Sequence, residues 1–571
     1  MGDRMNREGH QILGPIDAFL PLTDAESSLV GNLASGKFVG ADGSEGPAAG
    51  AQQYRIRAEV LRILLLGADP RYKMHEKGMR LCGALISGAL DLEGCRIPHN
   101  IHFRRCRFEA PLVLRSAIVD NLFLDGSALP GLHAEGLQVR GSLSISETDV
   151  SGAIQLVGAR LGGYLAADRI RVNANGTAFN AVGLETAGSI LLREACVVGS
   201  TILSNGRVGG DLSLAGGHFT CPAQLCVDGD GLTIRGDIIL RSTEIEGEVR
   251  LWGAQVGGNV DCSGGHLDNM SGDALSLNRA RIQGVFFLQR GATISGKLDL
   301  TASVIGALHD EAGSWPRPGD LSLNRCIYGA IIHGPVDAGS RIDWLSRQLP
   351  RAWPEFLPQP YEQLAGVLLE MGHQDDARAV LVEKERLQRQ ARRQRTSSPL
   401  FRFCYFLTDW ILALTVRYGH QPLYAFVWLF CFWMLGALVF EAAAYEGAIQ
   451  PNVPVVLRSQ EWTMCSVQRD ATPFRLASGE LVPGRAAAGQ TQLACFLEQP
   501  EAQSYPPFHP WVYSLDALLP VTSLGQREFW RPSPNGGLGA FALNYYYLQS
   551  VLGWSFSLLA VAGFSGIVKS R

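Results

Sequence analysis

The stretch that decides the fold runs from Gly141 to Val172 and reads GSLSISETDVS (141–151), GAIQLVGARLG (152–162) and GYLAADRIRV (163–172). The same short phrase returns eight times further along, beginning at Gly188, Gly199, Gly210, Gly236, Gly247, Gly258, Gly284 and Gly296. Within each full set the glycines are 11 residues apart. The sets begin at 141, 188, 236 and 284, so a larger unit of 47 or 48 residues is also repeated. Such self-similarity at a fixed period is the signature of a repeat protein.

Apolar residues alternate within each phrase, as at Leu143 and Ile145 or at Val249 and Leu251. Alternation with a period of two predicts a strand that buries one face, and a glycine just before the strand suits a corner. A single phrase can bury its apolar face only against its neighbours. We therefore predict a mainly β fold, a right-handed type of β-solenoid over residues 81–342. Whether an 11-residue phrase makes a whole coil or half of one stays open.

Helical or irregular segments flank the repeats. Residues 1–50 are polar, lack the pattern of a secretory signal and are expected to be flexible. Residues 51–80 contain YRIRAEVLRILLLG, whose apolar residues have helical spacing, and form an expected cap over the open end of the solenoid. Residues 343–396 predict a helical hairpin of the tetratricopeptide type that turns at Gly372. We interpret the hairpin as a neck, and binding of a partner peptide there is the alternative.

Two long apolar runs predict membrane spans, at residues 422–445 and 541–568. Basic residues precede the first run and follow the second, at Arg389, Arg392, Arg393, Arg395, Arg402, Lys569 and Arg571. The positive-inside rule then puts the solenoid and both termini in the cytoplasm. Residues 400–418 are apolar but interrupted by charges. We expect an interfacial helix there, and a third span is the alternative that would reverse the sidedness of all that follows.

The two spans would leave residues 446–540 outside the cytoplasm. Cys465 and Cys495 fall in this segment and are expected to form a disulfide, because that side is oxidising. Residues 509–530 form an amphipathic or re-entrant segment. Within it Thr522, Ser523, Leu524 and Gly525 loosely resemble the filter of two-span, pore-loop cation channels. Pro520, Gln526 and Arg527 depart from that pattern, and the alternative is an amphipathic hairpin on the outer leaflet.

The sequence assigns no catalytic, cofactor-binding or metal-binding residue. His218, Cys221 and Cys226 lack paired CxxC spacing, which favours structural cysteines. Phosphate-binding, serine-hydrolase and HExxH motifs do not occur. Aspartates recur at solenoid corners, and we expect solvated positions for Asp211, Asp237, Asp261 and Asp299. A net charge of −4 on 571 residues gives no nucleic-acid footprint.

Several phrases together carry a family resemblance: HEKGMRLCGALISGALDLEGCRIP, GEVRLWGAQVGGNVDCSG, GDALSLNRARIQG and YSLDALLPVTSLGQ. They resemble those of a widespread bacterial group of membrane-anchored repeat proteins. Members look like pentapeptide-repeat or bactofilin-type β-solenoids, and some carry the label "membrane-associated oxidoreductase". The 11-residue period departs from a strict pentapeptide period. Because the shared motifs are architectural, the resemblance transfers no catalytic residue.

The function expected from these features is a membrane-anchored scaffold or sensor, whose solenoid surface binds a protein partner without catalysis. The first alternative is an ion channel, a homo-oligomer whose Thr522–Gly525 loop lines the pore and whose solenoid gates it. The second is the oxidoreductase activity that the resemblance implies. The lipid bilayer is an expected partner in every case, and nucleic acid is not.

Overall fold

The computed structural model describes residues 16–40, 54–348, 356–395, 398–403, 405–406, 410, 423–519 and 521–564. The chain divides into two compact units, Met1–Lys384 and Glu385–Arg571, which we describe one at a time. The parts of the predictions for residues 1–50 and 400–418 that fall in the gaps, and residues 565–568 of the second predicted span, lie outside the described residues.

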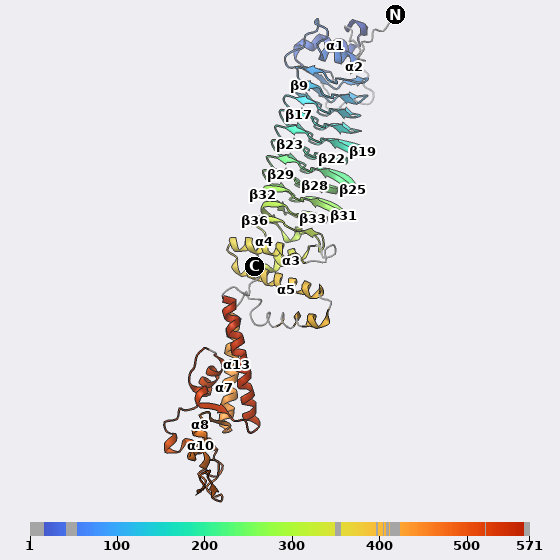
Figure 1. The fold of residues 1–571 in the computed structure, drawn as a ribbon. Helices are drawn as coiled ribbons and strands as arrows, with labels where there is room; N and C mark the ends of the chain where they lie inside the picture. The colour runs from blue at the N-terminus through green and yellow to red at the C-terminus, as the bar shows by residue number, and fades with distance from the viewer. Residues whose placement is uncertain are drawn as a thin grey trace. The chain divides into compact units, whose positions relative to one another are not determined.

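The first unit is a parallel β-solenoid of about 11 turns, in which coils stack strand upon strand (Figure 1). Each coil has four faces. Face 1 carries β5 (Arg96–Ile97), β9 (Ile118–Val119), β13 (Gln138–Val139), β17 (Arg160–Leu161), β20 (Glu185–Thr186), β23 (Arg207–Val208), β26 (Thr233–Ile234) and β29 (Gln255–Val256). Face 2 carries β3 (Met79–Cys82), β6 (Ile101–Arg104), β10 (Leu122–Phe123), β14 (Leu143–Ser144), β18 (Leu165–Ala166), β21 (Ile190–Leu191), β24 (Leu212–Ser213), β27 (Ile238–Ile239) and β30 (Val260–Asp261). Longer strands then cross both faces: β32 (Arg281–Leu288), β34 (Val304–Asp310) and β36 (Ile327–Ile331).

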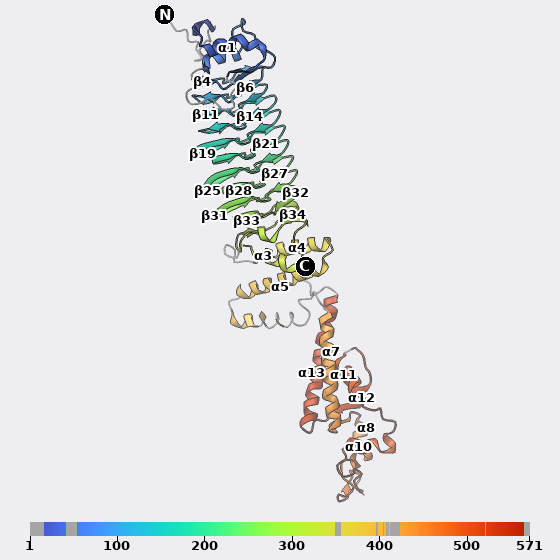
Figure 2. The ribbon, with the colours of Figure 1, turned by 180° about the vertical axis from the view of Figure 1, so that it is seen from behind.

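The other two faces belong to a second parallel sheet, seen from behind in Figure 2. Face 3 carries β2 (Arg55–Arg57), β4 (Leu85–Ser87), β7 (Arg107–Phe108), β11 (Ala128–Leu129) and β15 (Asp149–Val150). Face 4 carries β8 (Leu112–Val113), β12 (Leu132–His133) and β16 (Ile154–Gln155). Strands that cross both faces follow: β19 (Arg171–Asn180), β22 (Cys196–Ile202), β25 (His218–Asp228), β28 (Glu244–Arg250), β31 (His266–Ser276) and β33 (Thr293–Asp299), then the short β35 (Leu321–Ser322).

The register answers how many residues make one coil. Leu143 pairs with Leu165, and Ile190 pairs with Leu212, 22 positions later in each case. An 11-residue phrase is therefore half a coil and supplies two of the four faces. The alternating apolar residues all point into the column, where Leu143 and Ile154 are fully buried. This stacking buries an apolar face that one phrase could not bury alone.

Every second coil is longer, which explains the larger repeat. Leu165 pairs with Ile190 at a spacing of 25 residues, and Leu212 pairs with Ile238 at a spacing of 26. One 22-residue coil and one longer coil make the unit of 47 or 48 residues. The extra residues form β-bulges in β19, β25 and β31, where the register against the neighbouring strand breaks. Opposite one bulge Gly199 has φ 115°, and a Cβ there would lie 2.6 Å from the Gly176 carbonyl oxygen.

Helices close both ends of the column. At the N-terminal end are η1 (Ile16–Phe19), α1 (Asp24–Asn32), η2 (Leu33–Ser35), β1 (Val39–Gly40), which pairs with β3, and α2 (Ala58–Leu65). The predicted cap at 51–80 thus begins earlier, and residues 16–40 are ordered elements rather than a flexible segment. The reason is a buried contact: the carboxylate of Glu26, 0% exposed, accepts bonds from the Arg57 side chain and backbone and from Thr23.

The C-terminal end is closed by α3 (Ala338–Ser346), η4 (Ala312–Ser314) and α4 (Gln359–Glu370), which is followed by α5 (Gln374–Arg395). The helical hairpin predicted at 343–396 corresponds to α4 and α5, with Gly372 at φ 90° between them. It is more than a neck. Gln359 and Gln363 donate side-chain bonds of 3.0 and 2.7 Å to the carbonyls of Cys326 and Tyr328 at the last edge. The helix therefore occupies backbone groups that another chain's strand would otherwise pair with.

The second unit contains three helices that pack together, α7 (Leu423–Tyr445), α11 (Pro510–Leu518) and α13 (Gly537–Phe564) (Figure 2). Between α7 and α11 lie β37 (Ile449–Pro451), α8 (Pro454–Leu457), α9 (Gln460–Met464), β38 (Phe474–Arg475), β39 (Leu481–Val482), α10 (Gln492–Leu497) and η6 (Pro500–Ala502). After α11 come α12 (Gln526–Phe529) and β40 (Trp530–Pro532), which pairs antiparallel with β37.

Among the described residues one helix, α7, is long and apolar enough to cross a membrane. Of the two predicted spans, only 422–445 corresponds to a helix that passes this test of length and composition. The described part of α13 does not pass the same test.

Candidate functional site

A groove runs along face 1, where a glycine lies one or two residues after each strand from β13 to β29. The Cβ of an alanine at Gly209 would lie 2.1 Å from the Ala187 carbonyl oxygen of the preceding coil, and at Gly257 it would lie 2.4 Å from that of Arg235. At these two positions the close stacking of coils leaves no room for a side chain. The missing side chains leave hollows of about 590 and 770 Å³ over β13–β23 and β26–β34.

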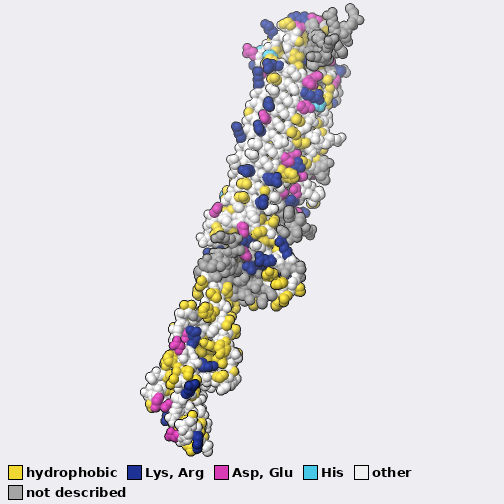
Figure 3. Space-filling view, viewed as in Figure 1, with side chains coloured by type: hydrophobic (Ala, Val, Ile, Leu, Met, Phe, Trp, Pro, Cys, Tyr) yellow, Lys and Arg dark blue, Asp and Glu magenta, His cyan; other side chains and the backbone are white. Residues whose placement is uncertain are grey.

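The outward side chains along this groove are strongly basic. The six arginines on face 1 and its corner, all exposed, are Arg96, Arg140, Arg160, Arg207, Arg235 and Arg281. Asp120 pairs with Arg140 at 3.1 Å, and Glu185 lies 3.5 and 3.6 Å from Arg160 and Arg207. Arg96, Arg235 and Arg281 form no ion pair with any residue that the structure describes. Dark blue side chains follow this edge of the solenoid in Figure 3.

The hollow over β26–β34 shows the imbalance most clearly. Arg235 and Arg281 line it together with Thr233, Gln255 and Gln283, and its lining contains no carboxylate. A guanidinium without a carboxylate is a donor of up to five N–H bonds with full charge. This site can accept acidic groups, and it provides neutral donors and acceptors beside them.

The corner aspartates have a different role from the solvated one expected for them. Asp211 accepts a bond of 2.9 Å from the backbone N–H of Asp237, whose own carboxylate accepts one of 2.6 Å from Asn259. These side chains tie each coil to the next. Asp261 and Asp299 are buried and accept bonds from backbone N–H groups two residues on, at 2.9 Å each. Backbone donors that would be orphaned at the corner are satisfied this way.

Burial raises the pKa of both Asp261 and Cys226, but hydrogen bonds reverse the net shift at Asp261. Burial raises the pKa of Asp261, but bonds from Ser263 and Arg241 outweigh it and hold the pKa below its ordinary value. Cys226 is fully buried, and burial raises its pKa to about 12, with the neighbouring Cys221 adding to the effect. A thiol of that kind packs as a small apolar group. In the described part of the chain no three His, Cys, Asp or Glu side chains are arranged to hold a metal.

In the second unit α11 lies against both long helices through buried polar contacts. The Ser514 hydroxyl donates to the Trp433 carbonyl of α7 at 2.8 Å and accepts from Gln549 of α13 at 2.8 Å. Small residues allow the close approach: a Cβ on Gly553 would lie 1.8 Å from the Leu518 carbonyl oxygen. Sequence reasoning missed Ser514 and Gln549. Their signal is a polar residue within a long apolar run.

The predicted pore-loop residues Thr522, Ser523, Leu524 and Gly525 follow α11 as a turn in this single chain. Thr522, Ser523 and Leu524 are exposed, and Gly525 has φ 80°. Asp516, whose side chain is fully buried, holds the turn by accepting bonds from the Leu524 N–H at 3.0 Å and the Arg527 N–H at 2.9 Å. Asp516 was not singled out from the sequence.

Arg527 affects whether the carbonyl oxygens of this turn are available to bind a cation. Its side chain pairs with Asp516 at 3.1 Å and donates to the Thr522 carbonyl oxygen at 3.4 Å. Cation filters use ring carbonyls as ligands, whereas here one of those carbonyls already accepts a bond from a guanidinium. The departure noted in the sequence at Arg527 therefore has a structural counterpart.

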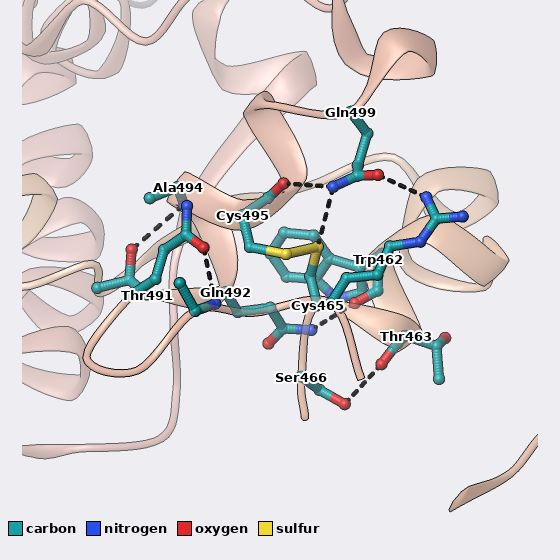
Figure 4. Close-up of a disulfide and its surroundings, with 12 residues drawn as sticks. Trp462, Thr463, Cys465, Ser466, Thr491, Gln492, Ala494, Cys495 and Gln499 are labelled. Carbon is teal, nitrogen blue, oxygen red and sulfur yellow. Dashed lines mark hydrogen bonds between the residues drawn. A yellow bond between two sulfur atoms is a disulfide. The ribbon is translucent and has the colours of Figure 1, made fainter. Parts of the chain in front are cut away.

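Cys465 and Cys495 are joined by a disulfide with a Cα–Cα distance of 5.6 Å, as drawn in Figure 4. The bond connects the end of α9 to α10. Gln499 caps it by donating to the Cys495 carbonyl at 3.0 Å, and the Trp462 ring packs edge-on against Phe496 at 5.4 Å. The disulfide belongs to a core that this segment shares with Phe440 of α7, Tyr513 of α11 and Tyr545 of α13.

Comparison of the chain with protein-family models, with curated proteins and with solved structures finds no match. The resemblance to membrane-anchored pentapeptide-repeat and bactofilin-like proteins therefore stays an expectation, and no function is transferred from a relative.

Proposed function

We propose that the protein is a membrane-anchored scaffold whose solenoid binds an acidic segment of a partner protein along the groove of face 1. The observation that carries this proposal is the hollow lined by Arg235 and Arg281 with no carboxylate beside them. Charge-assisted bonds from arginine to carboxylates are about twice as strong as neutral ones. The groove extends over successive coils, so an extended acidic peptide lying along it meets repeated basic positions.

Anchoring by the second unit is the other half of the proposal. Large apolar side chains are exposed on α7 and α13, including Phe426, Phe430 and Leu438 on the first and Val551 and Leu558 on the second. Exposed apolar surface of this extent is typical of contact with lipid or another protein. We take the bacterial inner membrane as the location, with α7 and α13 as spans and the solenoid in the cytoplasm. Cysteine-scanning accessibility in intact cells tests this orientation.

The experiment for the groove uses the full-length protein in detergent and a fluorescent poly-glutamate peptide as the probe. We expect saturable binding that weakens as salt rises, because exposed charges are screened. The double variant Arg235→Gln/Arg281→Gln is expected to lose at least tenfold in affinity, equivalent to about 1.4 kcal/mol. Arg279→Gln/Arg325→Gln is the matched control, since both arginines are exposed but lie at turns outside the groove lining.

Equal losses in the two double variants would show that only overall charge matters and would remove the groove from the proposal. A poly-lysine peptide that binds as well as poly-glutamate would remove the acidic partner.

A pore is the second candidate, favoured by the order span, short helix, turn, span and by the contacts of α11 with both α7 and α13. Under this hypothesis the chain forms a symmetric oligomer, and the Thr522–Gly525 turns of its subunits lie around the central axis. The guanidinium of Arg527 beside the turn disfavours conduction of cations. The test is to measure the oligomeric state in nanodiscs and ion flux in liposomes. A monomer without ion flux would rule out the pore, whereas a ring-shaped oligomer with ion flux would favour the pore over the anchored scaffold.

A further inference from the structure

A small cavity in the second unit has the composition of a binding site. It has a volume of about 180 Å³ and lies between Asn452 after β37, α11, the β40 strand and α13. Its lining includes Arg527, Arg531, Trp530, Tyr513 and Tyr546. The cavity is well below the usual 300–1,000 Å³ of sites for drug-sized ligands, so its occupant is a small molecule.

The charge balance of the cavity is positive by one. The Asp516 carboxylate neutralises the Arg527 guanidinium through an ion pair of 3.1 Å and also accepts a bond from the Arg527 backbone N–H. Arg531, half-buried on β40, makes neither an ion pair nor a side-chain hydrogen bond with the described residues. One N–H of the Asn452 side-chain amide donates to the Arg527 carbonyl oxygen at 2.9 Å. One unpaired guanidinium therefore faces the cavity, and it suits a ligand with a single negative charge.

Aromatic rings make the rest of the wall. The Tyr513 and Tyr546 rings lie 6.0 Å apart, and Trp530 is fully buried with its indole N–H bonded to the Pro506 carbonyl at 3.0 Å. No hydrogen bond to a described residue uses the hydroxyls of Tyr513 and Tyr546. Flat rings around one cation fit a small apolar or aromatic body that bears one polar group.

We propose that this cavity binds a small monocarboxylate, with the carboxylate on Arg531 and the body of the molecule against the tyrosines. A dianion such as phosphate would need a second free cation, which Asp516 removes by pairing with Arg527. The assignment is independent of the acidic partner proposed for the solenoid, because all lining residues belong to the second unit.

Calorimetric titration of the full-length protein in detergent tests this site, with benzoate and acetate as probes. Benzamide, benzylamine and inorganic phosphate are the neutral, cationic and dianionic comparisons. We expect saturable binding of benzoate with a stoichiometry of one, and a tenfold or greater loss of affinity in Arg531→Gln. Tyr546→Phe keeps the ring and is expected to weaken binding less. Arg475→Gln, on the exposed β38–β39 hairpin, is the matched control and should bind as the parent does.

Several results overturn the assignment. They are equal binding of benzamide and benzoate, an Arg531→Gln variant that binds unchanged, saturable phosphate binding without carboxylate binding, and no saturable binding of either carboxylate. Circular dichroism of each variant guards against misfolding. Arg531 bears no side-chain bond whose loss would unfold the β37–β40 pair.

Discussion

The bond between the last coil and α3 offers the sharpest test of how the solenoid is held together. Arg341 is fully buried and donates two bonds of 2.8 and 2.7 Å to the two carboxylate oxygens of Asp310. The Trp315 indole N–H donates to the same carboxylate at 2.6 Å, and the guanidinium lies 5.5 and 5.3 Å from the Trp315 and Trp344 rings. We predict that Arg341→Ala destabilises the C-terminal cap severely.

The magnitude follows from leaving a buried carboxylate without its partner. Breaking a buried pair costs about 3–5 kcal/mol, and at about 1.36 kcal/mol per tenfold the lower figure already corresponds to more than a hundredfold in an opening equilibrium. Each coil of a solenoid contacts only its neighbours, so the loss is local. Hydrogen exchange of the full-length protein should speed up at least a hundredfold in β34 and β36, while strands at the N-terminal end keep their protection.

Two comparison variants make the result decisive. Arg378→Ala removes an exposed pair with Asp375 at 3.2 Å and should cost less than about 1 kcal/mol. Arg341→Met/Asp310→Leu leaves no charge buried and should cost less than Arg341→Ala alone. The reasoning is refuted if Arg341→Ala exchanges no faster than Arg378→Ala, or if the double variant is the least stable of the three.

Three further predictions concern other parts of the chain. Gly209→Ala puts a Cβ 2.1 Å from a backbone carbonyl of the preceding coil and should cost about 1–3 kcal/mol in denaturant unfolding, whereas Gly313→Ala, with open space around it, should be nearly neutral. Burial raises the pKa of Glu26, but bonds from Arg57 and Thr23 outweigh it, so the folded pKa lies below the ordinary one of about 4.3. The stability that this carboxylate contributes is complete above the ordinary pKa and is lost as the pH falls through the lower pKa of the folded state. Proteolysis of the N-terminal cap should therefore rise in that pH range, and Glu26→Gln should make the rate of proteolysis less dependent on pH. The Cys465–Cys495 disulfide closes a loop of 30 residues, so its reduction should lower the stability of the segment between α7 and α11 by about 3–4 kcal/mol. Protease mapping measures this loss, and a Cys465→Ser/Cys495→Ser variant is the reference.

Element by element, prediction from the sequence succeeds where the pattern is local. The alternation around Leu143 predicts strands, and Gly372 predicts the turn between α4 and α5. The helical spacing in YRIRAEVLRILLLG predicts α2, although Arg55–Arg57 at its start form strand β2 instead. Prediction from the sequence fails where the local structure depends on a contact with a residue that is distant in the chain. Residues 16–40 are ordered because Glu26 forms an ion pair with Arg57, and the sequence of the first 40 residues alone does not predict that ion pair.

The site residues show the same division. A motif in the sequence identified Thr522–Gly525, but Asp516 and Arg527 determine which backbone groups of that turn are already hydrogen-bonded. Asp261 was expected in solvent and is buried, because a carboxylate beside backbone N–H groups is stable out of water. Sequence position alone does not show which donors surround an acid.

The sequence by itself determined that this protein is a β-solenoid with helical segments after it, because each 11-residue phrase has an apolar face that only its neighbours can bury. Only the tertiary structure decided that two phrases make a coil, that corner glycines leave a groove under unpaired arginines, and that Asn452, Tyr513, Arg531 and Tyr546 meet around one cavity. The physical reason is range. Periodic burial depends on residues close in the chain, whereas charge balance depends on every side chain that folding brings within a few ångströms.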